Sequence, residues 1–226
     1  EGTLGIITEV TVRLYAIPEA VSAAVCSFPD VDAAVRTAIE TIQSGVPIAR
    51  VELLDRRSMR AVNRYARLNY AETATLFLEF HGTARGVEEQ AGQVREIAAG
   101  NGGAAWVWAT EVEQRARLWQ ARHDMHYAVL AMRPGAKVMG TDVCVPISRL
   151  AECITETCAD TETASFFVST LGHVGDGNFH LGLLIDMASP AELAEAERLN
   201  ERVVARALRL GGTCTGEHGV GYGKIK

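Results

Sequence analysis

The sequence predicts an α+β fold made of two ferredoxin-like βαβ-type units, with antiparallel sheets side by side and helices packed on one face. The chain has 226 residues, of which 48% are hydrophobic, so it can bury a sizeable core. Short segments of strand-like composition alternate with segments that repeat apolar residues at helical spacing. This order of elements occurs twice, although the sequence itself does not repeat.

The first unit is predicted to follow a proline-containing linker at residues 15–20. Its first helix is capped by Asp30 and ended by Gly45. A polar helix is inserted before the third strand, and a GNGG turn closes the last helix. The predicted elements are strands over 20–28, 47–55, 74–82 and 104–110, and helices over 30–45, 56–69 and 86–99.

The second unit is predicted to repeat this plan with a longer first helix. Its last helix has clear boundaries, because Ser189 can cap it, Pro190 takes the first position and Gly211 follows its end. The predicted elements are helices over 111–131, 148–159 and 190–210, and strands over 137–146, 164–174 and 178–186.

The two ends of the chain suggest a piece of a longer protein. The first 14 residues lack a starting Met and already alternate as a strand would, and the last residues, GYGKIK, stop without a closing element. We therefore expect that some of the chemistry is supplied from outside this chain.

The composition argues against several classes of partner. The net charge is −6, and the basic residues are scattered, so no stripe is predicted that would bind nucleic acid. No apolar run approaches the roughly 20 residues that span a bilayer. The five cysteines include no CxxC pair and suit reduced thiols in a reducing compartment.

The segment GHVGDGNFH, residues 172–180, predicts a metal clamp. If Asp176 and Gly177 form the centre of a type I′ hairpin, His173 faces His180 across the two strands. Directly opposed side chains are close enough for both imidazoles to bind one ion. The alternative is that one histidine satisfies a hydrogen bond in the core and the other is exposed.

The glycine-rich segment TCTGEHGVGYGK, residues 213–224, offers a third ligand. We predict that Glu217 completes the site with His173 and His180, and that the ion is divalent, zinc or manganese. His218 would remain unligated as a general base. The alternative is an ordinary solvated turn.

The predicted helix over 111–131 carries a candidate anchor for a carboxylate. Trp119, Arg122 and His126 recur at helical spacing, and a guanidinium among aromatic rings suits a small carboxylate. The alternative is a surface arginine paired with an acid, and Arg133 is open to the same two interpretations. His81 is interpreted as structural.

Several segments resemble the FAD-linked oxidase family, which includes the cytochrome-type D-lactate dehydrogenases and glycolate oxidase. They are EGTLGIITEV, RPG, TDVCVPISRL, GHVGDGNFH and GTCTGEHGVGYGK. The resemblance implies that residues 1–16 are the tail of a mostly absent flavin-binding domain. The backbone along FAD would come from Glu1, Gly2, Thr3, Gly5, Ile6 and Ile7. Residues 17–226 would be the substrate (cap) domain, incomplete at its C-terminus.

The same resemblance implies the chemistry. His173, His180 and Glu217 would hold the metal, His218 would take the hydroxyl proton, and Arg122 with His126 would bind the substrate. A D-2-hydroxy acid would then pass hydride to FAD, and the fragment alone would be inactive. Dicarboxylate-oxidising relatives carry lysine and asparagine at the positions of Gly140 and Gly182, which favours D-lactate over 2-hydroxyglutarate, with glycolate as another alternative.

The resemblance also implies a partner that accepts electrons, such as a cytochrome, a quinone or an electron-transfer flavoprotein. A homodimer is one expected assembly. The expected locations are the cytoplasm, the surface of a bacterial inner membrane, or the mitochondrion. Two other classes remain open from the residues alone: a metal-dependent hydrolase with the same ligands, and a non-catalytic binding module in which the histidines only pack.

Overall fold

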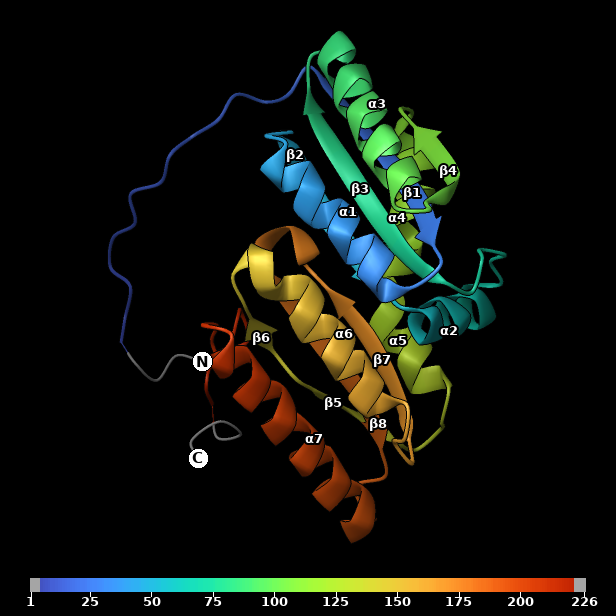
Figure 1. Cartoon of the computed structure of the whole chain (residues 1–226), viewed down its shortest axis with the longest axis vertical. Coiled ribbons are helices and arrows are strands. Elements are labelled where there is room, and N and C mark those ends of the chain that lie inside the picture. The colour runs from blue at the N-terminus through green and yellow to red at the C-terminus, as the bar shows by residue number, and fades with distance from the viewer. Residues whose placement is uncertain (1–4, 222–226) are drawn as a thin grey trace.

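The computed structural model describes residues 5–221 and contains one antiparallel sheet flanked by helices (Figure 1). The strands follow the order β4-β1-β3-β2-β7-β8-β5, and β6 pairs with β8 beside this path. The strands are β1 (Ala20–Phe28), β2 (Ile48–Leu54), β3 (Ala74–Gly82), β4 (Ala104–Ala109), β5 (Lys137–Gly140), β6 (Val143–Cys144), β7 (Phe167–Gly172) and β8 (Asn178–Ile185). The helices are α1 (Val31–Gln43), α2 (Arg56–Ala66), α3 (Ala84–Gly100), α4 (Val112–His123), α5 (Met125–Ala131), α6 (Leu150–Thr161) and α7 (Pro190–Arg209).

The two predicted units join through a short pairing between β2 and β7. Leu53 pairs with Gly172 and Leu54 with Leu171, which makes the two half-sheets continuous. The predicted fold class is confirmed, including antiparallel sheets side by side. The join matters for function because it brings β2 of the first unit next to the β7–β8 connection of the second.

Helices cover both faces of this sheet, which corrects the expectation of helices on one face. Helices α1, α3, α6 and α7 pack on one face, in front of the sheet in Figure 1. Helices α2, α4 and α5 pack on the other. The reason is visible in β1, where Ala24 and Cys26 enter the first core while Ala23 and Val25 enter the second. Both sheet faces are therefore apolar and need cover.

Two predicted strands and one predicted helix differ in the structure. Residues 5–18 form no strand and run beside the molecule without pairing to the sheet (Figure 1). The strand predicted over 137–146 is interrupted at Thr141 and Asp142, between β5 and β6. The helix predicted over 111–131 breaks at Asp124, whose side chain accepts a hydrogen bond from Gln120 at 2.8 Å. The backbone hydrogen bonds of a helix persist there, because Asp124 N–H donates to the Gln120 carbonyl at 2.9 Å and Ala128 N–H donates to the Asp124 carbonyl at 2.8 Å, so α4 and α5 follow each other almost directly.

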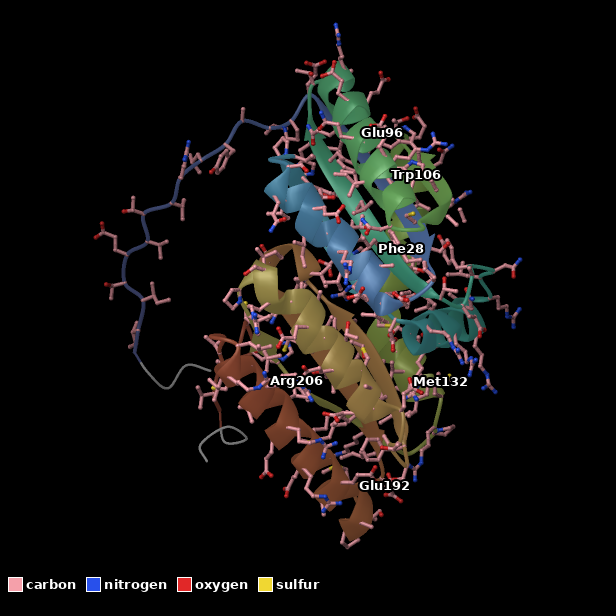
Figure 2. The ribbon with its side chains drawn as sticks, viewed as in Figure 1. Phe28, Glu96, Trp106, Met132, Glu192 and Arg206 are labelled. Carbon is pink, nitrogen blue, oxygen red and sulfur yellow. The ribbon has the colours of Figure 1, made fainter. Side chains whose placement is uncertain are left out.

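Ion pairs on the outside of the fold join the helices of the second unit. Arg206 of α7, labelled in Figure 2, contacts Glu156 at 2.9 Å and Asp160 at 2.7 Å on α6. Arg133 contacts Glu192 at 2.8 Å at the start of α7. For Arg133 the structure thus supports the surface-pair interpretation. All five cysteines are free.

Candidate active site and metal centre

Three side chains converge at the junction of the two units. Glu217 Oε1 lies 3.2 Å from His173 Nε2 and 3.1 Å from His180 Nε2. One potential ligand atom from each of the three residues lies within 4.8 Å of the others. The set predicted from the sequence is thus brought together, with two nitrogen ligands and one oxygen ligand of the type that zinc accepts.

The hairpin achieves this convergence by a different route from the predicted one. The register pairs His180 with Leu171, not with His173. Residues Val174–Asp176 form a 3₁₀ turn, and Gly177 has φ +78°, a left-handed conformation that favours glycine. The predicted type I′ hairpin is therefore wrong. The register is shifted by two residues, so His173 lies just beyond the end of β7 at Gly172, and the two imidazole rings meet edge to face, 5.8 Å apart.

In both histidines a hydrogen bond engages Nδ1 and leaves Nε2 available as a ligand. His173 Nδ1 lies 2.6 Å from Glu52 Oε1, and His180 Nδ1 lies 3.2 Å from the carbonyl of Thr141. An Nδ1–H donor fixes the tautomer in which Nε2 carries the lone pair. His180 Nε2 is buried and makes no hydrogen bond, and the atom beside it is Glu217 Oε1, 3.1 Å away. A buried nitrogen without a hydrogen bond, next to a second imidazole nitrogen and a carboxylate oxygen, fits a divalent cation.

The two histidines differ in electrostatic setting. The hydrogen bond to Glu52 raises the pKa of His173 above its ordinary value. Burial, followed by the nearby His218, lowers the pKa of His180. His180 is therefore readily neutral and able to act as a ligand, because metal binding requires the unprotonated imidazole.

Asp142 holds the loop that carries Glu217, and sequence reasoning missed it. Its Oδ2 accepts hydrogen bonds from the backbone nitrogens of Gly216, Glu217 and His218 at 2.8, 3.0 and 2.8 Å. Thr215 Oγ1 donates to the same oxygen at 2.7 Å. In the sequence it is an acid within the strand predicted over 137–146, and nothing local links it to Gly216, which lies 74 positions away.

These hydrogen-bond donors stabilise the ionised form of Asp142. Burial pushes the pKa of this carboxyl up, but hydrogen bonds from His218, Thr215 and Asn178 outweigh burial and leave the pKa below its usual range. Asp142, His180 and His218 also form a second group with metal-ligand spacing. Because Oδ2 already accepts four hydrogen bonds and Oδ1 accepts one from Asn178, we interpret Asp142 as a clamp on the loop.

The predicted base, His218, lies beside the three converging side chains. Its ring stacks on His180 with centroids 4.6 Å apart and planes 7° from parallel. The side chain is 50% exposed, and its Nε2 lies 3.5 Å from Glu217 Oε1. A half-exposed imidazole in this place can reach a bound substrate and still exchange protons with water.

Arg122 and His126 both line a cavity of about 270 Å³ that also contains His180, Glu217 and His218. Arg122 Nε donates to Glu52 Oε2 at 3.1 Å. The break at Asp124 separates the two residues onto α4 and α5. Trp119 does not join them: it is buried against Phe77, with Arg50 over its ring. The predicted anchor thus keeps Arg122 and His126 at the cavity and loses Trp119.

The rest of the cavity wall is mostly apolar, with His123 and Ser169 as further polar residues. Val138 and Val129 supply hydrocarbon, and Gly140 leaves open space where a side chain could stand. Gly182 leaves none, because an added Cβ would lie 2.5 Å from Ser169 Oγ. The cavity therefore combines one guanidinium, a histidine cluster and a short apolar wall, which suits a small anion with a small hydrocarbon group.

The flavin residues predicted from the resemblance are only partly described. Glu1, Gly2 and Thr3 lie outside the described residues. Gly5, Ile6 and Ile7 lie in the segment without helix or strand, where Ile6 is 91% exposed and Ile7 82% exposed. Among residues 5–221, no helix is both long enough and apolar enough to cross a membrane.

Comparisons with known proteins give a consistent result. The family model for FAD linked oxidases, C-terminal domain, matches residues 17–226. The chain is 52% identical over 224 residues to a probable mitochondrial D-lactate dehydrogenase of Danio rerio, covering 99% of the chain and 45% of that protein. It is 46% identical over 226 residues to the mitochondrial D-lactate dehydrogenase [cytochrome] of Arabidopsis thaliana, covering all of the chain and 40% of that protein.

More distant matches extend this picture. The glycolate oxidase subunit GlcD of Escherichia coli K12 is 30% identical over 227 residues, which cover 100% of the chain and 45% of that protein. A solved structure, the 4-ethylphenol oxidase from Gulosibacter chungangensis, shares the fold with a TM-score of 0.64 at 16% identity, over 86% of this chain and 45% of that one. The chain spans less than half the length of these curated relatives. Because the family model matches residues 17–226, the chain belongs to the family described as FAD linked oxidases, C-terminal domain.

Proposed function

We propose that this chain is the substrate- and metal-binding part of a flavoprotein that oxidises a D-2-hydroxy acid, with D-lactate as the first candidate. The observation that carries the proposal is the convergence of His173, His180 and Glu217 beside the cavity that Arg122 lines. The relatives named D-lactate dehydrogenase support the choice of substrate. The family implies FAD as the cofactor, held mainly by a part of the protein that precedes residue 17.

Each residue then has a definite task. Arg122 binds the substrate carboxylate through its guanidinium. His173, His180 and Glu217 would hold a divalent cation, which lowers the pKa of a nearby hydroxyl, and FAD would accept the hydride. His218 takes the hydroxyl proton on its ring nitrogen and passes it to water, since its side chain is half-exposed.

The cavity supports a small substrate. Beside Val138, the open space at Gly140 leaves room for a methyl group, and neither residue offers a cation for a second carboxylate. Lactate carries one carboxylate, one hydroxyl and one methyl group, and so uses each part of the wall. Glycolate lacks the methyl group and would leave the apolar side unfilled.

The proposal extends to partners and location through the relatives. Two curated relatives are named as mitochondrial, and one of these names includes a cytochrome. We propose a mitochondrial protein that passes electrons to a cytochrome. A homodimer, a bacterial location and the other electron acceptors have no support beyond the resemblance.

The test uses the complete flavoprotein under anaerobic conditions. D-lactate should bleach the flavin absorbance, L-lactate should not, and glycolate and D-2-hydroxyglutarate should act more slowly. Titration with zinc or manganese should restore activity after chelation, and His173→Ala should bind the metal much more weakly. If D-2-hydroxy acids leave the flavin oxidised in the metal-loaded protein, the proposed activity is wrong.

A further inference from the structure

Glu52 of β2 lies between two parts of the candidate site, and its carboxylate is shared between them. Oε1 is 2.6 Å from His173 Nδ1, and Oε2 accepts a hydrogen bond from Arg122 Nε at 3.1 Å. The side chains of Glu52 and Arg122 are 7% and 19% exposed. One buried acid therefore contacts both a proposed metal ligand and the proposed anchor of the substrate carboxylate.

The sheet register explains why Glu52 reaches His173. Leu53 pairs with Gly172 in the β2–β7 ladder, so the next pair outward places Glu52 opposite His173. Glu52 points to the face that α4 covers, and Arg122 reaches it from that helix. The short pairing that joins the two units is thus also the contact that brings the three charged groups together.

The fold alone does not require an acid at this position. On the same face of β2, Leu54 enters the core beneath α2, α4 and α5. A hydrophobic residue at position 52 would continue that pattern, whereas a buried carboxylate loses its hydration and must be compensated by partners. A buried charge that is tied to two site residues points to a role in the site.

We infer that Glu52 is a positioning residue that orients His173 for the metal and Arg122 for the substrate, an inference that rests on the proposed function. By accepting a hydrogen bond from Nδ1–H, Glu52 keeps the proton of the neutral His173 ring on Nδ1 and its lone pair on Nε2, which faces Glu217. By accepting a hydrogen bond from Arg122 Nε, Glu52 fixes the plane of the guanidinium. The two Nη groups stay free to bind a substrate carboxylate through two hydrogen bonds.

The chain contains a matched control for a purely local Glu–His contact. On the neighbouring strand β3, Glu79 Oε1 lies 2.9 Å from His81 Nε2, and both side chains are more exposed, at 18% and 43%. Neither residue lines the cavity of the candidate site. The variant Glu79→Gln removes the same chemical pair and should leave the metal and the substrate unaffected.

The first measurement needs no metal. In the metal-free protein, at a pH high enough for the His173 ring to have lost its charge, nitrogen NMR of the imidazole rings reports which nitrogen carries the remaining proton. His173 should carry it on Nδ1, and Glu52→Gln should give a mixture of the two tautomers. A His173 ring that carries its proton on Nε2 in the unmodified protein overturns the inference, whether or not the variant folds.

The second measurement is zinc affinity, determined by competition with a chelator. Glu52→Gln should weaken binding by about 10–100-fold, the range found when partners of metal ligands are removed. Glu79→Gln should bind zinc as the unmodified protein does. Equal affinity in Glu52→Gln overturns the inference, whereas an unmodified protein that binds neither zinc nor manganese overturns the proposed metal centre instead.

The closing measurement is KM for D-lactate in the complete metal-loaded flavoprotein, which tests whether Glu52 acts on the substrate through Arg122. Glu52→Gln should raise KM, and the same change made on top of Arg122→Met should raise KM no further, because Glu52 would act through a guanidinium that is already gone. Fully additive effects on KM would overturn the assignment. Failure of every variant and of the unmodified protein to oxidise D-lactate would instead contradict the proposed function.

Discussion

Two groups of acidic side chains in this molecule accept hydrogen bonds in different surroundings and have different consequences. At the junction of the two units, Glu52 and Asp142 are almost completely buried and hold residues of the candidate site. On the outside of the second unit, Arg206 joins α7 to Glu156 and Asp160 of α6, which are 45% and 27% exposed (Figure 2). The buried acids orient a site, and the partly exposed acids fasten two helices.

The difference follows from the surroundings. In water, an exposed ion pair gains little, because solvent screens the charges and the side chains lose freedom. A buried carboxylate cannot exchange its hydrogen-bond donors for water, so it fixes the position of the side chains or backbone groups that donate to it. Substitutions in the first group should therefore change ligand binding, and equivalent substitutions in the second should change only stability, by a small amount.

The largest effect is expected for Asp142→Asn. The amide oxygen can take the place of Oδ2 but carries no charge, and the NH₂ group would then stand against the Asn178 Nδ2 donor. Hydrogen bonds to a charged group are worth about 1.5–3 kcal/mol each. We expect the free energy of unfolding to fall by about 3 kcal/mol and zinc affinity to drop because Glu217 is no longer held in place. Urea unfolding and zinc titration measure the two effects.

The control for this prediction is Asp176→Asn, at an exposed position in the turn between β7 and β8. It changes the same charge close to the site without touching the Glu217 loop. If both aspartate variants bind zinc with the affinity of the unmodified protein, Asp142 does not position the loop.

The next effect is expected for Arg122→Met, which removes the proposed carboxylate anchor and leaves Glu52 buried without its guanidinium partner. KM for D-lactate should rise by about 10–100-fold, because a charged hydrogen bond of about 1.5–3 kcal/mol is lost. Steady-state kinetics of the complete flavoprotein measure the change. Arg133→Met, which removes a surface arginine paired with Glu192 and Asp186, is the matched control and should leave KM unchanged.

The sequence was sufficient for most of the fold because the local signals agree with the tertiary structure. Strands β1 and β3 have the predicted bounds, and Asp30 and Ser189 cap α1 and α7 as expected. The first 14 residues were predicted to alternate as a strand, and their described part, residues 5–14, is not one, because a strand needs a neighbour and alternation alone cannot supply it. The cover on the second sheet face was missed because it depends on how α2, α4 and α5 pack after the sheet is formed.

The candidate site shows the same division. His173, His180 and Glu217 could be chosen because ligand types in glycine-rich turns are a local signal. Glu52 and Asp142 could not be chosen in this way, because the residues that each of them holds are far away in the sequence. Glu52 and His173, for example, are 121 positions apart. The His173–His180 opposition was predicted from turn residues, yet the 3₁₀ turn shifts the register and places Glu52 opposite His173 instead.

The smallest effect is expected for Asp160→Asn on the outer ion pairs. Burial raises the pKa of Asp160, but hydrogen bonds from Arg206 and Arg202 outweigh it and leave the pKa below the unfolded value of about 3.9. A depressed folded-state pKa adds stability above the unfolded pKa and loses it as the pH falls through the folded pKa. The variant should thus be less stable than the unmodified protein by at most about 1 kcal/mol at neutral pH, and the difference should vanish in acid. Urea unfolding across this pH range measures the difference in stability, and zinc titration should give the same affinity for both proteins. A stability difference that grows on acidification would show that another group governs the contact.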